Sequence, residues 1–138
     1  MDKNIIKRII KWNKERGLDK KEFDIKTETI NIIEELIEMS DVNVESNEAR
    51  ERAEMIVESI IDQSTSTTKS NTIDALCDII VYATGALLKL GVDPECAMDE
   101  TLKEIESRTG KIINGKFVKD TSEEAKKRWY KADYKKCY

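Results

Sequence analysis

Apolar residues recur at helical spacing along most of the chain. In residues 2–16 they form one stripe, and Gly17 follows at a position where glycine commonly ends a helix. The opposite face of this segment is basic, so the pattern predicts a surface helix that packs through Ile5, Ile6, Ile9 and Ile10.

The segment 27–39 has two separate faces. Its apolar face predicts contact with the core through Ile30, Ile33, Leu36 and Ile37. Its polar stripe, at spacings of three, four and three, consists of Glu28, Asn31, Glu35 and Glu38, and Glu34 flanks it. A solvated acidic face would be the simpler explanation if this helix stood alone. Apolar residues border the stripe, however, and this favours a functional site over a solvated face.

A third helical pattern covers residues 47–62. Its apolar positions are Ala49, Ala53, Ile56, Val57, Ile60 and Ile61. Residues 63–70 contain no apolar side chain and are predicted to form a mobile loop.

The most apolar part of the chain is the stretch from Asn71 to Leu90. Between Ile73 and Leu88 its only charged residues are Asp74 and Asp78. A helix that is apolar nearly all round is typical of the interior of a bundle, so we expect a central, buried helix here. Carboxylates four residues apart lie on the same helix face, and buried carboxylates need a cation, donors or protons.

The last third of the chain contains two helix starts and a turn. Asp93-Pro94 predicts the N-terminus of a helix that packs through Met98, Leu102 and Ile105. Asn114-Gly115, between two short β-prone runs, predicts a hairpin over residues 111–119. Thr121 and Glu124 form a capping box for a last helix that would contain Trp129, Tyr130 and Tyr134.

Length and composition favour one all-α domain over residues 1–138, with the short hairpin as its only β structure. The chain has a single proline and five glycines, which leave few breaks. The net charge of −4 is unevenly spread: residues 1–102 carry −9 and residues 103–138 carry +5. Carboxylates early and cations late would suit an anionic ligand held through a metal ion.

Cysteine and histidine usage limits the chemistry. The three cysteines form no CxxC pair, so we expect reduced thiols, with Cys77 as a small core residue. The chain has no histidine, which excludes His-based acid–base catalysis and zinc sites that use His. A metal ion here should therefore be a hard cation with oxygen ligands, Mg²⁺ or alternatively Mn²⁺.

The sequence predicts a soluble, cytoplasmic protein. Lys7, Arg8 and Lys11 interrupt the apolar residues at the start, unlike in a signal peptide. The longest apolar run contains Asp78 and is expected to be too short to cross a bilayer.

The two acidic segments suggest a shared site. Carboxylates from Glu35 and Glu38 on one helix, and from Asp74 and Asp78 on another, could ligate one divalent ion that also binds substrate phosphates. Lysines and arginines from the C-terminal part would cover the remaining phosphate charge. No GxxxxGK[ST] motif is present, so the chain is not a P-loop protein.

These motifs resemble a known family. EELIE at 34–38 matches the EExxE motif of the all-α nucleoside triphosphate pyrophosphohydrolases, the MazG-like superfamily. DALCDIIVYATGALLKLG resembles the second acidic helix of its phage and bacterial members. SRTGK at 107–111 and GKFVKDTSEEAKKRWYKADY resemble its C-terminal part. The resemblance covers roughly residues 27–134.

The resemblance implies Mg²⁺-dependent hydrolysis of a nucleoside triphosphate between the α and β phosphates, as in nucleotide-pool clearance. It implies catalytic roles for Glu34, Glu35 and Glu38, and metal binding by Glu35, Glu38, Asp74 and Asp78. It places the phosphates against Arg108, Lys111 and Lys116. Candidates for the base pocket are Asn31, Ile32, Tyr82 and Trp12.

The chain departs from the family pattern in two places. The usual second motif is ExxD, but this chain has Ala75 where the Glu would stand and offers Asp74 instead. The spacer between the acidic helices is also longer than usual.

Two other functions fit the sequence, namely a non-catalytic helical module that binds a partner and a nucleic-acid-binding protein that uses the basic, aromatic tail. The negative body of the chain disfavours the latter.

We also expect a homodimer or homotetramer, because a few short helices cannot bury all the apolar faces, and because family members commonly form such oligomers.

Overall fold

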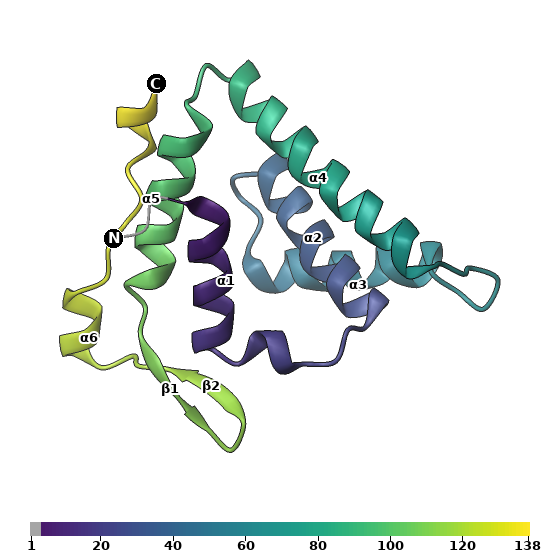
Figure 1. Ribbon diagram of the computed structural model, residues 1–138, viewed down its shortest axis with the longest axis horizontal. Coiled ribbons are helices and arrows are strands. Elements are labelled where there is room, and N and C mark those ends of the chain that lie inside the picture. Colours follow the sequence, from purple (N-terminus) through teal and green to yellow (C-terminus); the bar gives the residue numbers. More distant parts are fainter. Residues whose placement is uncertain (1–3) are drawn as a thin grey trace. The chain divides into compact units, whose positions relative to one another are not determined.

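The computed structural model describes residues 4–138, which are 65% helical and contain one two-stranded antiparallel sheet (Figure 1). The elements are α1 (Ile5–Glu15), η1 (Leu18–Lys20), α2 (Ile25–Ser40), α3 (Ser46–Ile60), α4 (Lys69–Lys89), α5 (Pro94–Glu106), β1 (Gly110–Ile113), β2 (Lys116–Lys119), α6 (Glu123–Lys127) and η2 (Tyr134–Cys137). The predicted helical fold with a short hairpin is confirmed at this level. The first expected helix also included residues 2 and 3, which lie outside the described residues.

The chain divides into two compact units. Unit 1 combines the described residues up to Lys21 with Asp74–Tyr138, and unit 2 is Glu22–Ile73. Helix α4 begins in unit 2 and continues in unit 1. The expectation of a single domain stays a prediction.

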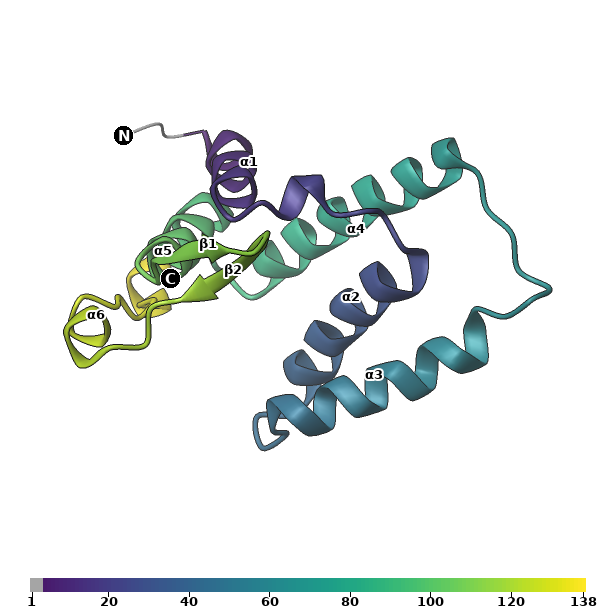
Figure 2. The ribbon, with the colours of Figure 1, turned by 90° about the horizontal axis from the view of Figure 1, so that it is seen from below.

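Unit 2 is a helical hairpin of α2 and α3, whose short connection is seen in Figure 2. Asp24 caps α2 by accepting a hydrogen bond from the Thr27 N–H. The core contains Ile37, Ala49 and Ala53, with Ile30, Ile33 and Val44 packed against it. Small alanine side chains let the two helices approach closely, and this explains why α3 buries Ala49, Ala53 and Val57.

The predicted apolar stripes of unit 2 are wider than the faces that are buried. Leu36 of α2 is 50% exposed, and Ile56 and Ile60 of α3 are 40% and 52% exposed. Each helix packs against one partner within the unit, so a single line of residues is covered and the expected burial of these three side chains was wrong.

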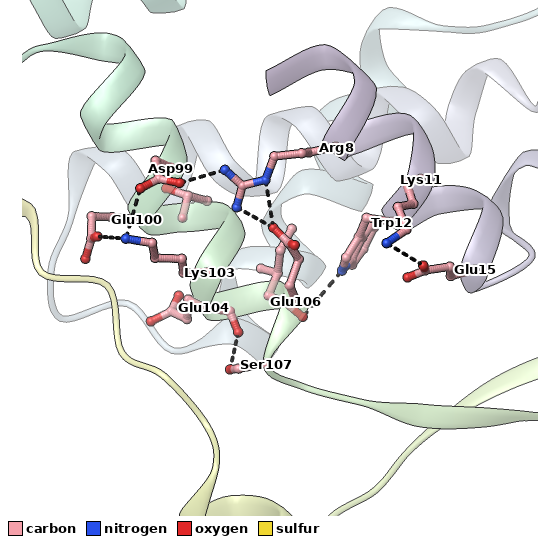
Figure 3. Close-up of polar contacts among 12 residues, drawn as sticks. Arg8, Lys11, Trp12, Glu15, Asp99, Glu100, Lys103, Glu104, Glu106 and Ser107 are labelled. Atoms are coloured by element: carbon pink, nitrogen blue, oxygen red, sulfur yellow. Dashed lines mark hydrogen bonds and ion pairs between the residues drawn. The ribbon is translucent and has the colours of Figure 1, made fainter. Parts of the chain in front are cut away.

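In unit 1, α1 lies beside α5 and is joined to it by a buried arginine (Figure 3). The Arg8 guanidinium donates to Asp99 and to Glu106, both at 2.6 Å. The Trp12 indole N–H donates to the Ile105 carbonyl at 3.4 Å. Ion pairs therefore help to hold the predicted surface helix, whose Ile6 and Ile10 remain about half exposed.

Helix α5 begins as predicted, with Asp93 as N-cap and Pro94 in the first turn. Of its expected core residues, Leu102 is buried, whereas Met98 and Ile105 are half-buried. A buried carboxylate, Glu100, was not foreseen. It is 1% exposed.

Glu100 binds the C-terminal segment to α5. It accepts hydrogen bonds from the Tyr130 hydroxyl at 2.5 Å and the Asp133 N–H at 2.9 Å, and it pairs with Lys136 at 2.9 Å. The Tyr130 hydrogen bond is the main cause that lowers the pKa of Glu100 to about 2, against the opposing effect of burial. This carboxylate is therefore ionised and fully partnered.

The cysteines differ from the prediction of reduced thiols. Cys96 at the start of α5 and Cys137 in η2 form a disulfide across 41 residues. Cys77, expected in the core, is exposed. Spacing alone did not indicate the pair, because the tail returns to α5 through long-range contacts, including one from the Asp93 N–H to the Cys137 carbonyl.

The hairpin follows the prediction. β1 and β2 pair antiparallel with Ile113 opposite Lys116, and both Asn114 and Gly115 have positive φ, as a two-residue turn of this kind requires.

The last helix does not follow the prediction. α6 is capped by Ser122 rather than Thr121, and it ends at Lys127. Consequently Trp129, Tyr130 and Tyr134 lie outside it.

Helix α4 is the largest departure from the expected fold. None of its residues is buried, although a central, buried helix was expected. By length and composition α4 is also long enough to cross a membrane, so the expectation of too short a run was wrong. Asp74 and Asp78 would each cost about 2.5–3.5 kcal/mol near a bilayer centre, which opposes insertion. A soluble, cytoplasmic protein stays a prediction.

Candidate functional site

The acidic stripe of α2 is divided into paired and unpaired carboxylates. Arg50 of α3 donates to Glu34 at 3.2 Å and to the Asn31 side-chain oxygen at 2.6 Å. The Glu34 side chain is 21% exposed and is held in place by this contact. The pairing neutralises Glu34 and fixes Asn31 beside it.

Glu35 and Glu38 are different. Neither side chain makes a hydrogen bond or ion pair with any residue in the described part of the chain. Partial burial, and then repulsion by the Glu38 and Glu34 carboxylates, raises the pKa of Glu35. A partly buried carboxylate with acidic neighbours attracts protons and divalent cations alike. This pair can therefore supply two oxygen ligands to one ion.

Asp74 and Asp78 are exposed on α4, and they too lack a hydrogen bond or ion pair with a described residue. They belong to unit 1, whereas the α2 acids belong to unit 2. Within either unit, the described residues include no group of three acidic or cysteine side chains close enough to hold a metal ion. Convergence of the two pairs stays a prediction.

Two of the three predicted phosphate-binding cations line one pocket in unit 1. Arg108 and Lys116 share this pocket with Trp12, a candidate for the base site. Lys111 lines a different pocket at the hairpin, beside Gly110 and Asp120. The structure thus brings together Arg108, Lys116 and Trp12, and it places Lys111 in another pocket.

The other base-site candidates are divided between the two units. Asn31 is occupied by Arg50, Ile32 is half-buried in unit 2, and Tyr82 in unit 1 is 79% exposed. Their role stays a prediction.

Sequence reasoning overlooked Arg50, Arg16 and Phe117. Arg16 is buried between the rings of Trp12 and Phe117, at 4.6 and 4.9 Å from their centroids. A signal was present for Arg50, because a cation on the next helix is the natural partner of an acidic face. No local pattern connects Arg16 with Phe117, one hundred residues later.

The aromatic side chains of the tail are engaged within unit 1. Tyr130 donates to Glu100, and the Tyr134 hydroxyl lies 2.9 Å from that of Thr101. Trp129 lies under the cations of Arg108 and Lys119. These contacts give the residues a structural role that does not depend on nucleic acid.

No family model matches the chain, and no curated protein or solved structure shows a significant match to it. Membership of the MazG-like superfamily therefore stays a prediction from the motifs.

Proposed function

We propose that the protein is a Mg²⁺-dependent nucleotide pyrophosphohydrolase of the MazG-like type, with the corresponding helical fold. It would cleave a nucleoside triphosphate or deoxynucleoside triphosphate between the α and β phosphates, releasing monophosphate and pyrophosphate. The resemblance of EELIE and of the α4 sequence to the family motifs is the starting point.

One observation carries the proposal, namely the unneutralised pair Glu35 and Glu38. Two carboxylates one helical turn apart repel each other, and no described cation offsets them. Glu34, by contrast, has Arg50 as its partner. The pair is explained if a cation from solution binds it.

The donor set fits magnesium. Mg²⁺ prefers oxygen ligands, and it is usually held by one or two carboxylates together with waters and substrate phosphates. Glu35 and Glu38 would hold it, with Asp74 and Asp78 as further ligands from α4. When bound, the ion neutralises phosphate oxygens and acidifies the attacking water.

The protein's own residues supply the remaining parts. Glu34, whose side chain is oriented by Arg50, would accept a hydrogen bond from the attacking water. Arg108 and Lys116 would offer positive charge to the phosphates, and Lys111 would add to it from the hairpin.

A second copy of the chain would cover α4. Exposed apolar side chains run the length of this helix: Ile73, Leu76, Ile79, Ile80, Val81, Leu88. Burying such a face stabilises association by roughly 25 cal/mol per Å² of apolar surface. Size-exclusion chromatography with light scattering should give a mass of at least two chains. A species of 15.9 kDa would contradict the oligomer.

The same exposed face is the observation that favours the second candidate, a non-catalytic module that binds another protein through α4. The two functions differ in their response to ligands. Thermal stabilisation by Mg²⁺ together with a nucleotide is expected for the hydrolase, and its absence is expected for the module.

The test of the proposed activity is pyrophosphate release from all common nucleoside and deoxynucleoside triphosphates, with and without Mg²⁺. We expect activity on at least one of them. Glu38→Gln and Asp78→Asn should each lower kcat at least 100-fold, because each removes a metal ligand. Glu51→Gln, an exposed acid on α3, is the matched control.

Circular dichroism should show that all three variants keep the helical content of the original chain. Wild-type activity in both Glu38→Gln and Asp78→Asn would contradict the proposal.

A further inference from the structure

The pocket of unit 1 that contains Arg108 is both apolar and positively charged. Its volume is about 280 Å³. Its apolar wall is formed by Trp12, Leu18, Ile105 and Phe117. Its cations are Arg16, Lys21, Arg108, Lys116 and Lys119, and none of its described lining residues is acidic.

The charge of Arg16 is fixed inside the protein. Arg16 is 8% exposed, and its guanidinium donates to the backbone carbonyls of Ile105 and Arg108. Its one carboxylate contact is to the exposed Glu15 at 4.0 Å. Burial accordingly lowers the pKa of Arg16, although the group stays charged. A buried cation that is bonded mainly to carbonyls contributes positive potential to the pocket beside it.

Arg108 has bonding capacity left over. Its guanidinium makes no hydrogen bond or ion pair with a described residue, and its buried Nε lacks a partner. The buried indole N–H of Trp129, whose ring lies 5.6 Å from that guanidinium, also lacks one. Buried donors without acceptors are costly. The Nη groups of Arg108 are not buried and have no partner among the described residues, so they can bind an anion in the pocket.

Lys116 and Lys119 add mobile charge at the hairpin. Both are exposed, and neither forms an ion pair within the described residues. Their ammonium groups can follow a phosphate that enters beside Arg108. The pocket thus combines the buried charge of Arg16, the unpartnered guanidinium of Arg108, flexible lysine side chains and an apolar wall.

We propose that this pocket binds one nucleoside monophosphate without a metal ion, with the phosphate at Arg108 and Lys116 and the base against the wall of Phe117, Ile105 and Trp12. The size supports a mononucleotide over a polymer, because 280 Å³ lies just below the usual range of pockets that hold small ligands, about 300–1,000 Å³. The choice of a nucleotide rests on the proposed function. The pocket lies wholly in unit 1 and uses no acid of α2 or α4.

The test is equilibrium binding of AMP, GMP, CMP and UMP to the full chain in EDTA, by calorimetry and by fluorescence. Both tryptophans, Trp12 and Trp129, belong to unit 1 and report on this region. At least one monophosphate should bind. Adenosine or the matching nucleoside, and inorganic phosphate alone, should each bind at least tenfold more weakly, because each lacks half of the recognised ligand.

Variants assign the binding to this pocket. Arg108→Gln and Lys116→Gln should each weaken monophosphate binding at least fivefold, and Phe117→Leu should weaken it several-fold. Lys135→Gln changes the charge equally at an exposed position outside the pocket, and it should change affinity less than twofold. Lys116 is exposed, so its variant tests the pocket without disturbing the fold.

Three outcomes would overturn the inference: no monophosphate binds in EDTA, both charge variants bind like the original chain, or a single-stranded oligonucleotide binds more tightly than its mononucleotides. Failure of the proposed function looks different. Glu38→Gln and Asp78→Asn should keep monophosphate binding in EDTA while they lose hydrolysis. A chain that binds monophosphate but never releases pyrophosphate would retain the pocket and lose the enzyme.

Discussion

Helices α5 and α2 both carry a dense row of carboxylates, yet the protein treats the two rows differently. Every acid of α5 from Asp99 onward has a partner: Arg8, Lys103 and Lys136 are the cations, and Tyr130 and backbone N–H groups are the donors. On α2, one cation of the same unit, Arg50, meets Glu34. Glu35 and Glu38 remain without a partner among the described residues.

The pKa shifts follow this difference. The pKa of Glu100 is lowered to about 2, because its hydrogen bonds favour the ionised form. The pKa of Glu35 is raised instead, by burial and by its acidic neighbours. The carboxylates that hold α5 to the rest of unit 1 are therefore neutralised from within the chain, whereas Glu35 combines the lack of such a partner with a raised pKa.

The largest effect on stability is expected from Glu100→Gln. Its carboxylate has a lower pKa in the folded state than the ordinary 4.5, so its contribution is present above pH 4.5 and is lost as the pH falls toward 2. At pH 7 the variant should melt at least about 5 °C lower than the original chain. The two melting temperatures should converge as the pH approaches 2.

Tryptophan fluorescence is the suitable probe, because both tryptophans lie in unit 1 with Glu100. Glu51→Gln serves as control and should leave the melting temperature within about 1 °C at every pH. A constant difference between Glu100→Gln and the original chain from pH 7 to pH 2 would refute the assignment of the lowered pKa to Glu100.

Local patterns predicted the local structure. Apolar spacing gave α1 to α3 and α5 within a few residues, Asp93-Pro94 gave the start of α5, and Asn114-Gly115 gave the hairpin turn. Each of these depends on side chains within about one or two turns of each other. The error at α6 is of the same kind. Ser122 and Thr121 are adjacent capping residues, and Ser122 makes the hydrogen bond.

Long-range contacts were beyond the sequence. Glu100 looks like one more surface acid in the sequence, because its partners Tyr130, Asp133 and Lys136 lie thirty or more residues later. The disulfide of Cys96 and Cys137 depends on the same return of the chain. The expected burial of α4 failed for another reason. Apolar composition indicates that a helix face is suited to burial, but it does not indicate which surface would cover that face.

The candidate site was predictable in part. EELIE identified the α2 acids, and the basic tail identified Arg108 and Lys116, which share a pocket. The sequence did not show that Glu34 is paired while Glu35 and Glu38 are not. That difference depends on the position of Arg50 on α3, opposite Glu34. The buried position of Arg16 could not be predicted from the sequence, because it depends on contacts among α1, the end of α5 and β2.

The most direct measurement is the titration of the full chain with Mn²⁺, as a stand-in for Mg²⁺, followed by the electron paramagnetic resonance of the free ion. The central claim is that Glu35 and Glu38 hold a divalent cation together with Asp78. Glu35→Gln, Glu38→Gln and Asp78→Asn should each weaken binding at least tenfold at pH 7, and Glu51→Gln should not. Binding should also strengthen as the pH rises above 4.5, because Glu35, with its raised pKa, loses its proton there. Unchanged Mn²⁺ affinity in Glu38→Gln would contradict the account.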